Sequence, residues 1–233
     1  MDKPFSVPFE HTKLLGDTMS AVEEKPSVLF FHGAGTSSRM RWQGIGELLL
    51  AQGIGSYAFD FIGHGETGGD MSSSSLASRT KQALAVVEAI KIPTPLTLIG
   101  ASMGAYTALK VSEKIPVSKI IFFVPAMYDR ELYEIPFGPQ FTEMIRKPNS
   151  WQNSDAWAIL GEFTGKLLII AADKDETVPK EITQKIYDSA VRAEERKLYY
   201  VPGAPHQVLR ALDKDPDEMK KVVSMIADFI RQK

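Results

Sequence analysis

Residues 100–104 of this 233-residue chain read Gly-Ala-Ser-Met-Gly, which places one serine between two glycines. A serine hydroxyl is a weak nucleophile until a neighbouring base removes its proton. Of the four histidines, only His206 follows Ser102 in the chain, and it comes directly after the last predicted strand. We therefore interpret Ser102 as a nucleophile and His206 as its general base, a pair suited to acyl transfer.

Such a pair needs a carboxylate that orients the imidazole and stabilises its charged form. Asp173 and Asp175 both follow the predicted strand 167–171. We favour Asp175, because it lies shortly before residues 178–179, where the chain turns into the next helix. Asp173 is then assigned to the turn, and Asp129, after the preceding strand, is the weakest of the three candidates.

The negative charge that develops on an attacked carbonyl oxygen needs hydrogen-bond donors. The run His32-Gly-Ala-Gly follows a buried strand, and its glycines allow the backbone to approach the reacting atoms closely. We predict that the backbone amides of Ala34 and Met103 form this oxyanion hole. The His32 side chain is interpreted as structural.

A second glycine pattern, Gly63-His-Gly-Glu-Thr-Gly, matches the Gly-x-Gly-x-x-Gly of dinucleotide sites. That interpretation is rejected because residues 69–75 separate the last glycine from the next predicted helix. Glu88 also falls inside that helix rather than at the end of a strand, where a ribose-binding acid belongs. We expect no cofactor and no metal ion.

These residues need a scaffold that brings distant segments together. Short apolar runs predict strands, and amphipathic segments between them predict helices. The strands are expected over 27–31, 56–61, 96–100, 119–124, 167–171 and 197–201, and the helices over 42–52, 76–91, 102–114, 180–192 and 216–232. This alternation predicts an α/β domain with a mostly parallel twisted sheet and helices on both faces, and it places Ser102 on a strand-to-helix turn. The first 26 residues are expected to form an antiparallel hairpin that turns at Gly16-Asp17.

Within this single domain, 1–233, the connection 126–164 breaks the alternation after the sixth strand. Its many aromatic residues predict a lid or cap, the alternative being short helices that only pack on the surface. We expect Met127, Trp151 and Trp157 to contact the substrate. An apolar pocket of this kind would prefer uncharged acyl or aromatic esters.

Composition narrows the class of protein further. Lys+Arg number 27 and Asp+Glu 29, for a net charge of -2, so no nucleic-acid partner is expected. The longest strongly apolar run, 120–127, is too short to span a membrane. Residues 1–13 lack the apolar core of a signal peptide, and the chain has no cysteine, so a cytoplasmic location is expected. Nothing here indicates an oligomeric state.

Five motifs together resemble the α/β-hydrolase superfamily across nearly the whole chain. They are His32-Gly-Ala-Gly, Asp60-Phe-Ile-Gly-His-Gly, Gly100-Ala-Ser-Met-Gly, Asp175-Glu-Thr-Val-Pro and Gly203-Ala-Pro-His. The size and the insertion are similar to small carboxylesterases of the cinnamoyl-esterase and monoacylglycerol-lipase type. The resemblance implies a Ser-Asp-His triad that cleaves a carboxylic ester of a small molecule through an acyl-enzyme. A thioesterase or other acyl-transfer enzyme, and a non-catalytic ligand-binding protein on this scaffold, are the alternatives.

Overall fold

The computed structural model describes residues 2–20 and 25–232. Within them one eight-stranded sheet has the order β1-β2-β4-β3-β5-β6-β7-β8. Strands β3 to β8 run parallel, and β2 pairs antiparallel with both β1 and β4. The strands are β1 (Asp2–Phe9), β2 (Thr12–Met19), β3 (Val28–Phe31), β4 (Ser56–Phe59), β5 (Leu96–Ala101), β6 (Val117–Phe123), β7 (Lys166–Ala172) and β8 (Glu195–Val201).

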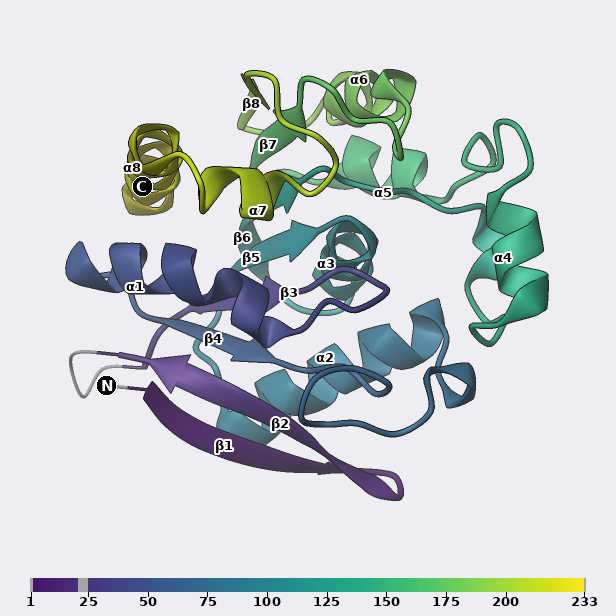
Figure 1. Ribbon diagram of the computed structural model, residues 1–233, viewed down its shortest axis with the longest axis horizontal. Helices are drawn as coiled ribbons and strands as arrows, with labels where there is room; N and C mark the ends of the chain where they lie inside the picture. Colours follow the sequence, from purple (N-terminus) through teal and green to yellow (C-terminus); the bar gives the residue numbers. More distant parts are fainter. Residues whose placement is uncertain (1, 21–24, 233) are drawn as a thin grey trace.

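Helices cover both faces of this sheet, as expected for the α/β class (Figure 1). The helices are η1 (Arg39–Trp42), α1 (Gln43–Ala51), η2 (Met71–Ser73), α2 (Leu76–Ile90), α3 (Met103–Ser112), η3 (Arg130–Leu132), α4 (Pro139–Ile145), α5 (Ala156–Glu162), α6 (Lys180–Ser189), α7 (Val208–Leu212) and α8 (Pro216–Arg231). Helices α1 and α8 lie on one side of the sheet, and α2 and α3 lie on the other (Figure 1).

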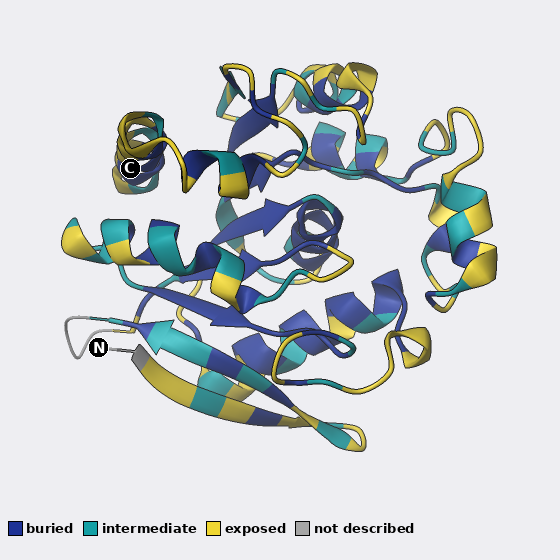
Figure 2. Ribbon diagram, in the orientation of Figure 1, coloured by how far each residue is buried: buried dark blue, intermediate teal, exposed yellow. Residues whose placement is uncertain are grey.

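The buried strands explain why two hydrophobic cores form. Successive side chains of a strand point to opposite faces. In β3, Leu29 and Phe31 enter the core beneath α2 and α3, whereas Val28 and Phe30 enter the core beneath α1 and α8. Figure 2 shows the central strands buried along their length. This arrangement confirms the predicted fold class.

The predicted strands and helices are present, with ends that differ by up to three residues, as where α6 ends at Ser189 rather than at 192. The predicted hairpin turn at Gly16-Asp17 is wrong. The turn lies at Glu10-His11, and Gly16 sits inside β2 opposite Phe5. A Cβ on Gly16 would lie 2.3 Å from the Phe5 ring, so close packing, not a turn, requires this glycine. Residues 1 and 21–24 of the predicted hairpin region lie outside the described residues.

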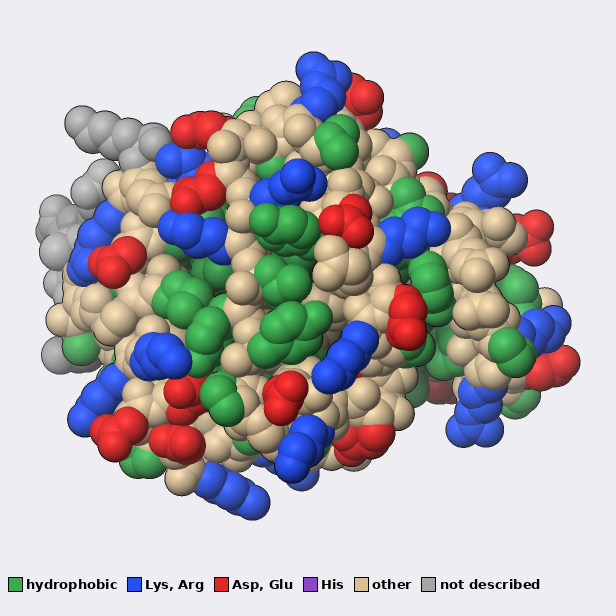
Figure 3. Space-filling model, turned by 90° about the horizontal axis from the view of Figure 1, so that it is seen from above, with side chains coloured by type: hydrophobic (Ala, Val, Ile, Leu, Met, Phe, Trp, Pro, Cys, Tyr) green, Lys and Arg blue, Asp and Glu red, His purple; other side chains and the backbone are tan. Residues whose placement is uncertain are grey.

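The connection from β6 to β7 carries η3, α4 and α5, with α4 standing out from the body at the end of the molecule opposite α8 (Figures 1 and 3). Its aromatic rings pack on one another: Phe141 contacts both Tyr128 and Phe137. Asp155 ties the connection to α3, because it accepts hydrogen bonds from the Tyr106 hydroxyl and the Lys110 ammonium. Its description as a lid stays a prediction.

Strand β8 forms the far edge of the sheet. Seen from above, apolar side chains on this face are interspersed with lysine, arginine and acidic side chains (Figure 3). Charges of this kind on an edge oppose pairing with another chain. Among residues 2–20 and 25–232, no helix combines the length and apolarity needed to cross a membrane.

Candidate active site

Ser102 occupies a strained turn between β5 and α3. Its φ of 50° and ψ of -116° lie in a region that residues with a side chain rarely adopt. A Cβ on Gly100 would lie 2.4 Å from the Gly104 carbonyl oxygen, and one on Gly104 would lie 2.3 Å from the Phe31 carbonyl oxygen. The two glycines are thus required because strand and helix backbones approach each other closely around the serine. The turn places Ser102 at the N-terminus of α3, which is the positive end of the helix dipole.

Three segments far apart in the chain meet at this serine. The Ser102 hydroxyl lies 3.2 Å from Nε2 of His206, and Nδ1 of His206 lies 2.8 Å from Oδ2 of Asp175. His206 follows β8, and Asp175 follows β7, so both come from the carboxyl ends of neighbouring parallel strands. With Nδ1–H donating to Asp175, Nε2 is left to accept the serine proton.

The three candidate acids lie in different places. Asp175 faces the imidazole of His206, whereas Asp173 accepts a hydrogen bond from the Gly203 amide and faces Lys180 at 3.9 Å. Asp129 caps η3 by accepting the Glu131 amide at 2.9 Å. Of the three, Asp175 has the position that an orienting carboxylate needs.

The carboxylate of Asp175 is kept ionised by its donors. Burial raises its pKa, but the hydrogen bond from His206 and the amides of Val178 and Thr177 outweigh burial and lower the pKa below its ordinary value. A carboxylate that accepts several N–H donors is stabilised in its charged form. Asp175 can therefore stabilise a positive charge on the imidazole without taking its proton.

The predicted oxyanion donors flank the serine. Met103 is the first residue of α3, where backbone amides have no partner within the helix. Ala34 lines the same cavity as Ser102, and a Cβ on Gly33 would lie 3.4 Å from Ser102 Cβ, so the loop passes directly beside Ser102. Their roles as donors stay a prediction.

Residues 32–35 form the loop that carries Ala34, the predicted oxyanion loop, and the side chain of His32 restrains it. Its ring Nδ1–H donates to the Gly33 carbonyl oxygen at 2.8 Å, and Nε2 accepts the Phe61 amide at 3.1 Å. Burial first, and then the positive charge of Arg79, lower the pKa of His32 well below its ordinary value, so the ring is neutral. A neutral, doubly bonded ring agrees with a structural role. A guanidinium N–H of Arg79 also donates to the His32 carbonyl oxygen.

The glycine pattern at residues 63–68 also has a structural explanation. Asp60, which is fully buried, accepts the amides of Arg39 and Glu66 and pairs with the Arg39 guanidinium. A Cβ on Gly65 would collide with the Asp60 carboxylate at 2.2 Å. The loop 63–68 therefore packs closely around the ion pair of Asp60 and Arg39, and this close packing requires glycine at position 65.

Ser102 and His206 open onto a cavity of about 400 Å³. Its lining consists of Gly33, Ala34, Gly35, Thr36, Ser37, Arg41, Ala101, Ser102, Val124, Thr177, His206, Gln207, Val208, Leu209 and Arg210. A volume of this size falls within the range of roughly 300–1,000 Å³ that is usual for small-molecule sites. Among the described residues, no group of three or more histidine or acidic side chains is placed to hold a metal ion.

The three residues predicted to contact the substrate do not line this cavity. Met127 is buried in the core beneath α2 and α3. Trp151 and Trp157 meet edge to face with centroids 6.0 Å apart, and the Lys185 ammonium lies over both rings. Their assignment to substrate binding stays a prediction.

Sequence reasoning missed three arginines near the site: Arg41 and Arg210 in the cavity wall, and Arg79 behind the oxyanion loop. Arg210 could have been found from the sequence, because it lies only four residues after His206. Arg79 lies among apolar residues of a predicted helix, and its full burial has no counterpart in the sequence pattern.

Comparisons with known proteins identify the family of this chain. The sequence model of the family described as serine aminopeptidase, S33, matches residues 22–152. No curated protein sequence matches the chain.

Solved structures share the whole fold at low identity. Est1E from Butyrivibrio proteoclasticus, solved with ferulic acid bound, has a TM-score of 0.77 at 20% identity, covering 98% of this chain and 100% of its own. The Pyrococcus furiosus esterase Pf2001 has a TM-score of 0.73 at 22% identity, with coverage of 99% and 92%. The monoacylglycerol lipase of Paleococcus ferrophilus has a TM-score of 0.71 at 18% identity, with coverage of 93% and 99%. The family match and the fold together establish that this chain belongs to the serine aminopeptidase S33 family of α/β-hydrolases.

Proposed function

We propose that the protein is a serine hydrolase that cleaves carboxylic esters through an acyl-enzyme. The observation that carries this proposal is the continuous hydrogen-bond path from the Ser102 hydroxyl through His206 to Asp175, at the wall of a cavity. Nucleophile, base and orienting acid in this geometry are the recognised requirement for acyl transfer by serine.

The reaction follows from the atoms in place. Nε2 of His206 takes the proton of Ser102 as Oγ bonds to the ester carbonyl carbon. The oxyanion then accepts the amides of Ala34 and Met103, and the imidazolium gives its proton to the leaving alcohol as the C–O bond breaks. Water, deprotonated by His206, attacks the acyl-enzyme, which releases the carboxylic acid and returns the proton to Ser102.

The name of the family raises peptide hydrolysis as another reaction. An aminopeptidase must bind the positive α-ammonium group of its substrate, for which a carboxylate is the natural partner. In the part of the chain that the structure describes, the cavity lining includes two arginines, Arg41 and Arg210, and no aspartate or glutamate. This charge distribution supports ester over aminopeptide hydrolysis.

The proposal is tested with p-nitrophenyl butyrate and a fluorophosphonate probe. We expect hydrolysis and covalent labelling by the wild type, and loss of labelling with a drop in kcat of about 10³-fold or more in Ser102→Ala. Ser112→Ala, on α3 and outside the cavity, is the matched control and retains both activities. The butyryl thioester of N-acetylcysteamine separates the alternatives: faster cleavage of the thioester would replace the esterase by a thioesterase, and absence of labelling would favour a binding protein.

A further inference from the structure

Two positively charged side chains form part of the wall beside Ser102. Arg41 belongs to η1, which follows the oxyanion loop, and Arg210 belongs to α7, which follows His206. The two arginines therefore come from the two chain segments that carry the predicted oxyanion donor and the predicted base. Neither guanidinium has a hydrogen bond or an ion pair with any of the described residues.

Arg39, on the same short helix as Arg41, shows what a structural arginine looks like in this protein. Its guanidinium is buried and pairs with three carboxylates, those of Asp17, Asp60 and Glu66. Arg41, two residues later, is half-buried and has no such partner. Arg39 thus takes up the carboxylates of Asp17, Asp60 and Glu66, whereas Arg41 forms part of the cavity lining.

The described residues of the lining include no negative side chain that offsets these charges. Among residues 2–20 and 25–232, no aspartate or glutamate lines the cavity, and the Asp175 carboxylate pairs with Nδ1 of His206. The described side chains of the lining therefore carry an excess of positive charge, although the chain has a net charge of -2. A concave surface of one sign concentrates ligands of the opposite sign.

Arginine also favours a particular kind of anion. Its planar guanidinium presents parallel N–H donors that match the oxygen pairs of a carboxylate or phosphate. Two such groups from different segments of one cavity lining can together bind the oxygen atoms of a single anionic group beside Ser102.

We propose that the preferred ester of this enzyme carries an anionic group, a carboxylate or a phosphate, which Arg41 and Arg210 bind while Ser102 attacks the ester carbonyl. This inference rests on the proposed esterase function and specifies its substrate class. It replaces the preference for uncharged esters that the aromatic connection 126–164 predicted, because that connection contributes none of the cavity lining.

The test compares esters that differ only in one anionic group. On the acid side, the mono-p-nitrophenyl ester of adipic acid is compared with p-nitrophenyl hexanoate. On the alcohol side, butyryl glycerol 3-phosphate is compared with monobutyrin. We expect kcat/KM to be higher for the anionic member of at least one pair, and the pair that responds identifies the side of the ester that carries the charge.

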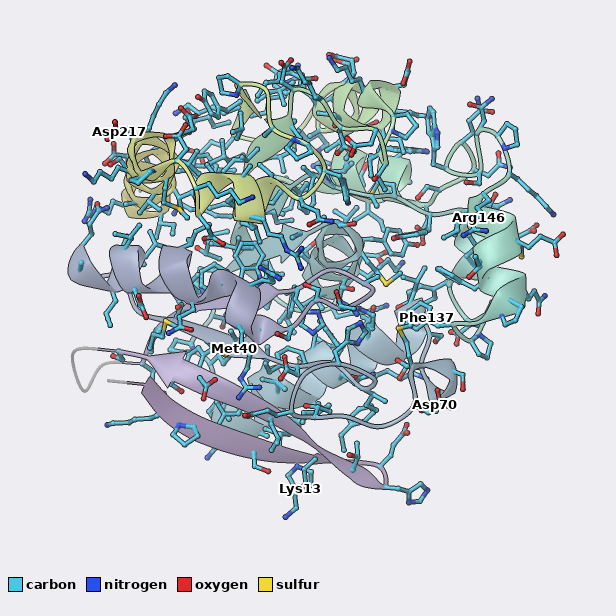
Figure 4. All side chains as sticks on the ribbon, in the orientation of Figure 1. Lys13, Met40, Asp70, Phe137, Arg146 and Asp217 are labelled. Atoms are coloured by element: carbon cyan, nitrogen blue, oxygen red, sulfur yellow. The ribbon has the colours of Figure 1, made fainter. Side chains whose placement is uncertain are left out.

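Substitution then assigns the preference to the arginines. In Arg41→Gln and in Arg210→Gln, the ratio of kcat/KM for the anionic ester to that for the neutral ester falls about tenfold, as expected for one lost charge-assisted hydrogen bond. Arg146→Gln is the matched control: Arg146 is an exposed residue that follows α4 (Figure 4) and is not part of the cavity lining, so this variant keeps the wild-type ratio. Arg210→Glu reverses the preference towards the p-nitrophenyl ester of 6-aminohexanoic acid.

The possible failures are distinguishable. If the wild type hydrolyses none of the four esters, the proposed function itself fails. If it hydrolyses the neutral esters but shows no anionic preference in either pair, or a preference that the glutamine variants leave unchanged, only the present inference is overturned. Should Arg41→Gln not fold, Arg210→Gln and the salt dependence of the wild-type ratio decide, since added salt lowers the ratio only if charge attraction causes it.

Discussion

The guanidinium of Arg79 donates a hydrogen bond to the backbone carbonyl oxygen of His32, the residue that begins the oxyanion loop. Arg79 is fully buried, lies 3.7 Å from the centre of the Phe61 ring, and has two nitrogens, Nε and Nη1, without a hydrogen-bond partner among the described residues. Burial lowers its pKa to about 9. The protein thus keeps a cation with unpaired N–H groups beside the loop that carries Ala34, and its hydrogen bond to His32 restrains that loop.

We predict that Arg79→Met separates activity from stability. Replacing a buried charge by an apolar side chain of similar size is often neutral or stabilising, so the melting temperature should fall by no more than a few degrees. The kcat for p-nitrophenyl butyrate should fall about tenfold, with little change in KM, because the oxyanion loop loses one restraint. Unchanged kcat would mean that the His32 ring holds the loop alone.

The two neighbouring aspartates should differ sharply. Asp175→Asn removes the charge that stabilises the imidazolium and should lower kcat by orders of magnitude, up to about 10⁴-fold. Asp173→Asn loses only contacts to the Gly203 amide and Lys180, and should lower kcat less than about threefold, as for a solvent-exposed ion pair. Steady-state kinetics of both variants test this, and the reverse ranking would assign the orienting acid to Asp173.

Acid stability should depend on His32. In the unfolded chain this histidine titrates at about pH 6.5, whereas burial holds its pKa well below that value in the folded protein. Between these two pH values the unfolded chain binds a proton that the folded protein excludes, so the free energy of unfolding falls as the pH falls.

Urea unfolding from pH 7 down to pH 4 measures this dependence. His32→Gln is less stable at pH 7, because its ring contacts are lost, but its free energy of unfolding falls less steeply with acidification. His11→Gln, at the exposed β1–β2 turn, keeps the wild-type slope. An identical slope in His32→Gln would contradict the prediction.

Trp151 and Trp157 provide a test of the connection 126–164. Their contacts with each other and with Lys185 predict that alanine at either position lowers the free energy of unfolding by about 1–3 kcal/mol. The substrate-binding prediction requires more: a changed ranking of long and aromatic esters, with hydrolysis of a small acetate ester preserved. A lower melting temperature with an unchanged ranking would leave the tryptophans as packing residues only.

The sequence by itself determined the features that depend on short-range patterns. The strand-to-helix turn at Ser102 could be predicted because such a turn needs small residues at 100 and 104, and the backbone contacts of these glycines give the reason. The central strands could be found because both of their faces are buried, which leaves unbroken apolar runs. The same reasoning misread Gly16 as a turn, because a glycine required by the Phe5 ring on the neighbouring strand looks no different in sequence from one required by a bend.

Only the tertiary structure decided which side chains share one cavity. His206 is 104 residues from Ser102, and its contact with Asp175 rather than Asp173 depends on how the loops after β7 and β8 meet. Arg39 and Arg41 are two residues apart on one short helix, yet one is buried among three carboxylates and the other faces the cavity. Charge carries no local periodicity, so the partner of an arginine, or its lack of one, is determined by contacts between segments far apart in the chain.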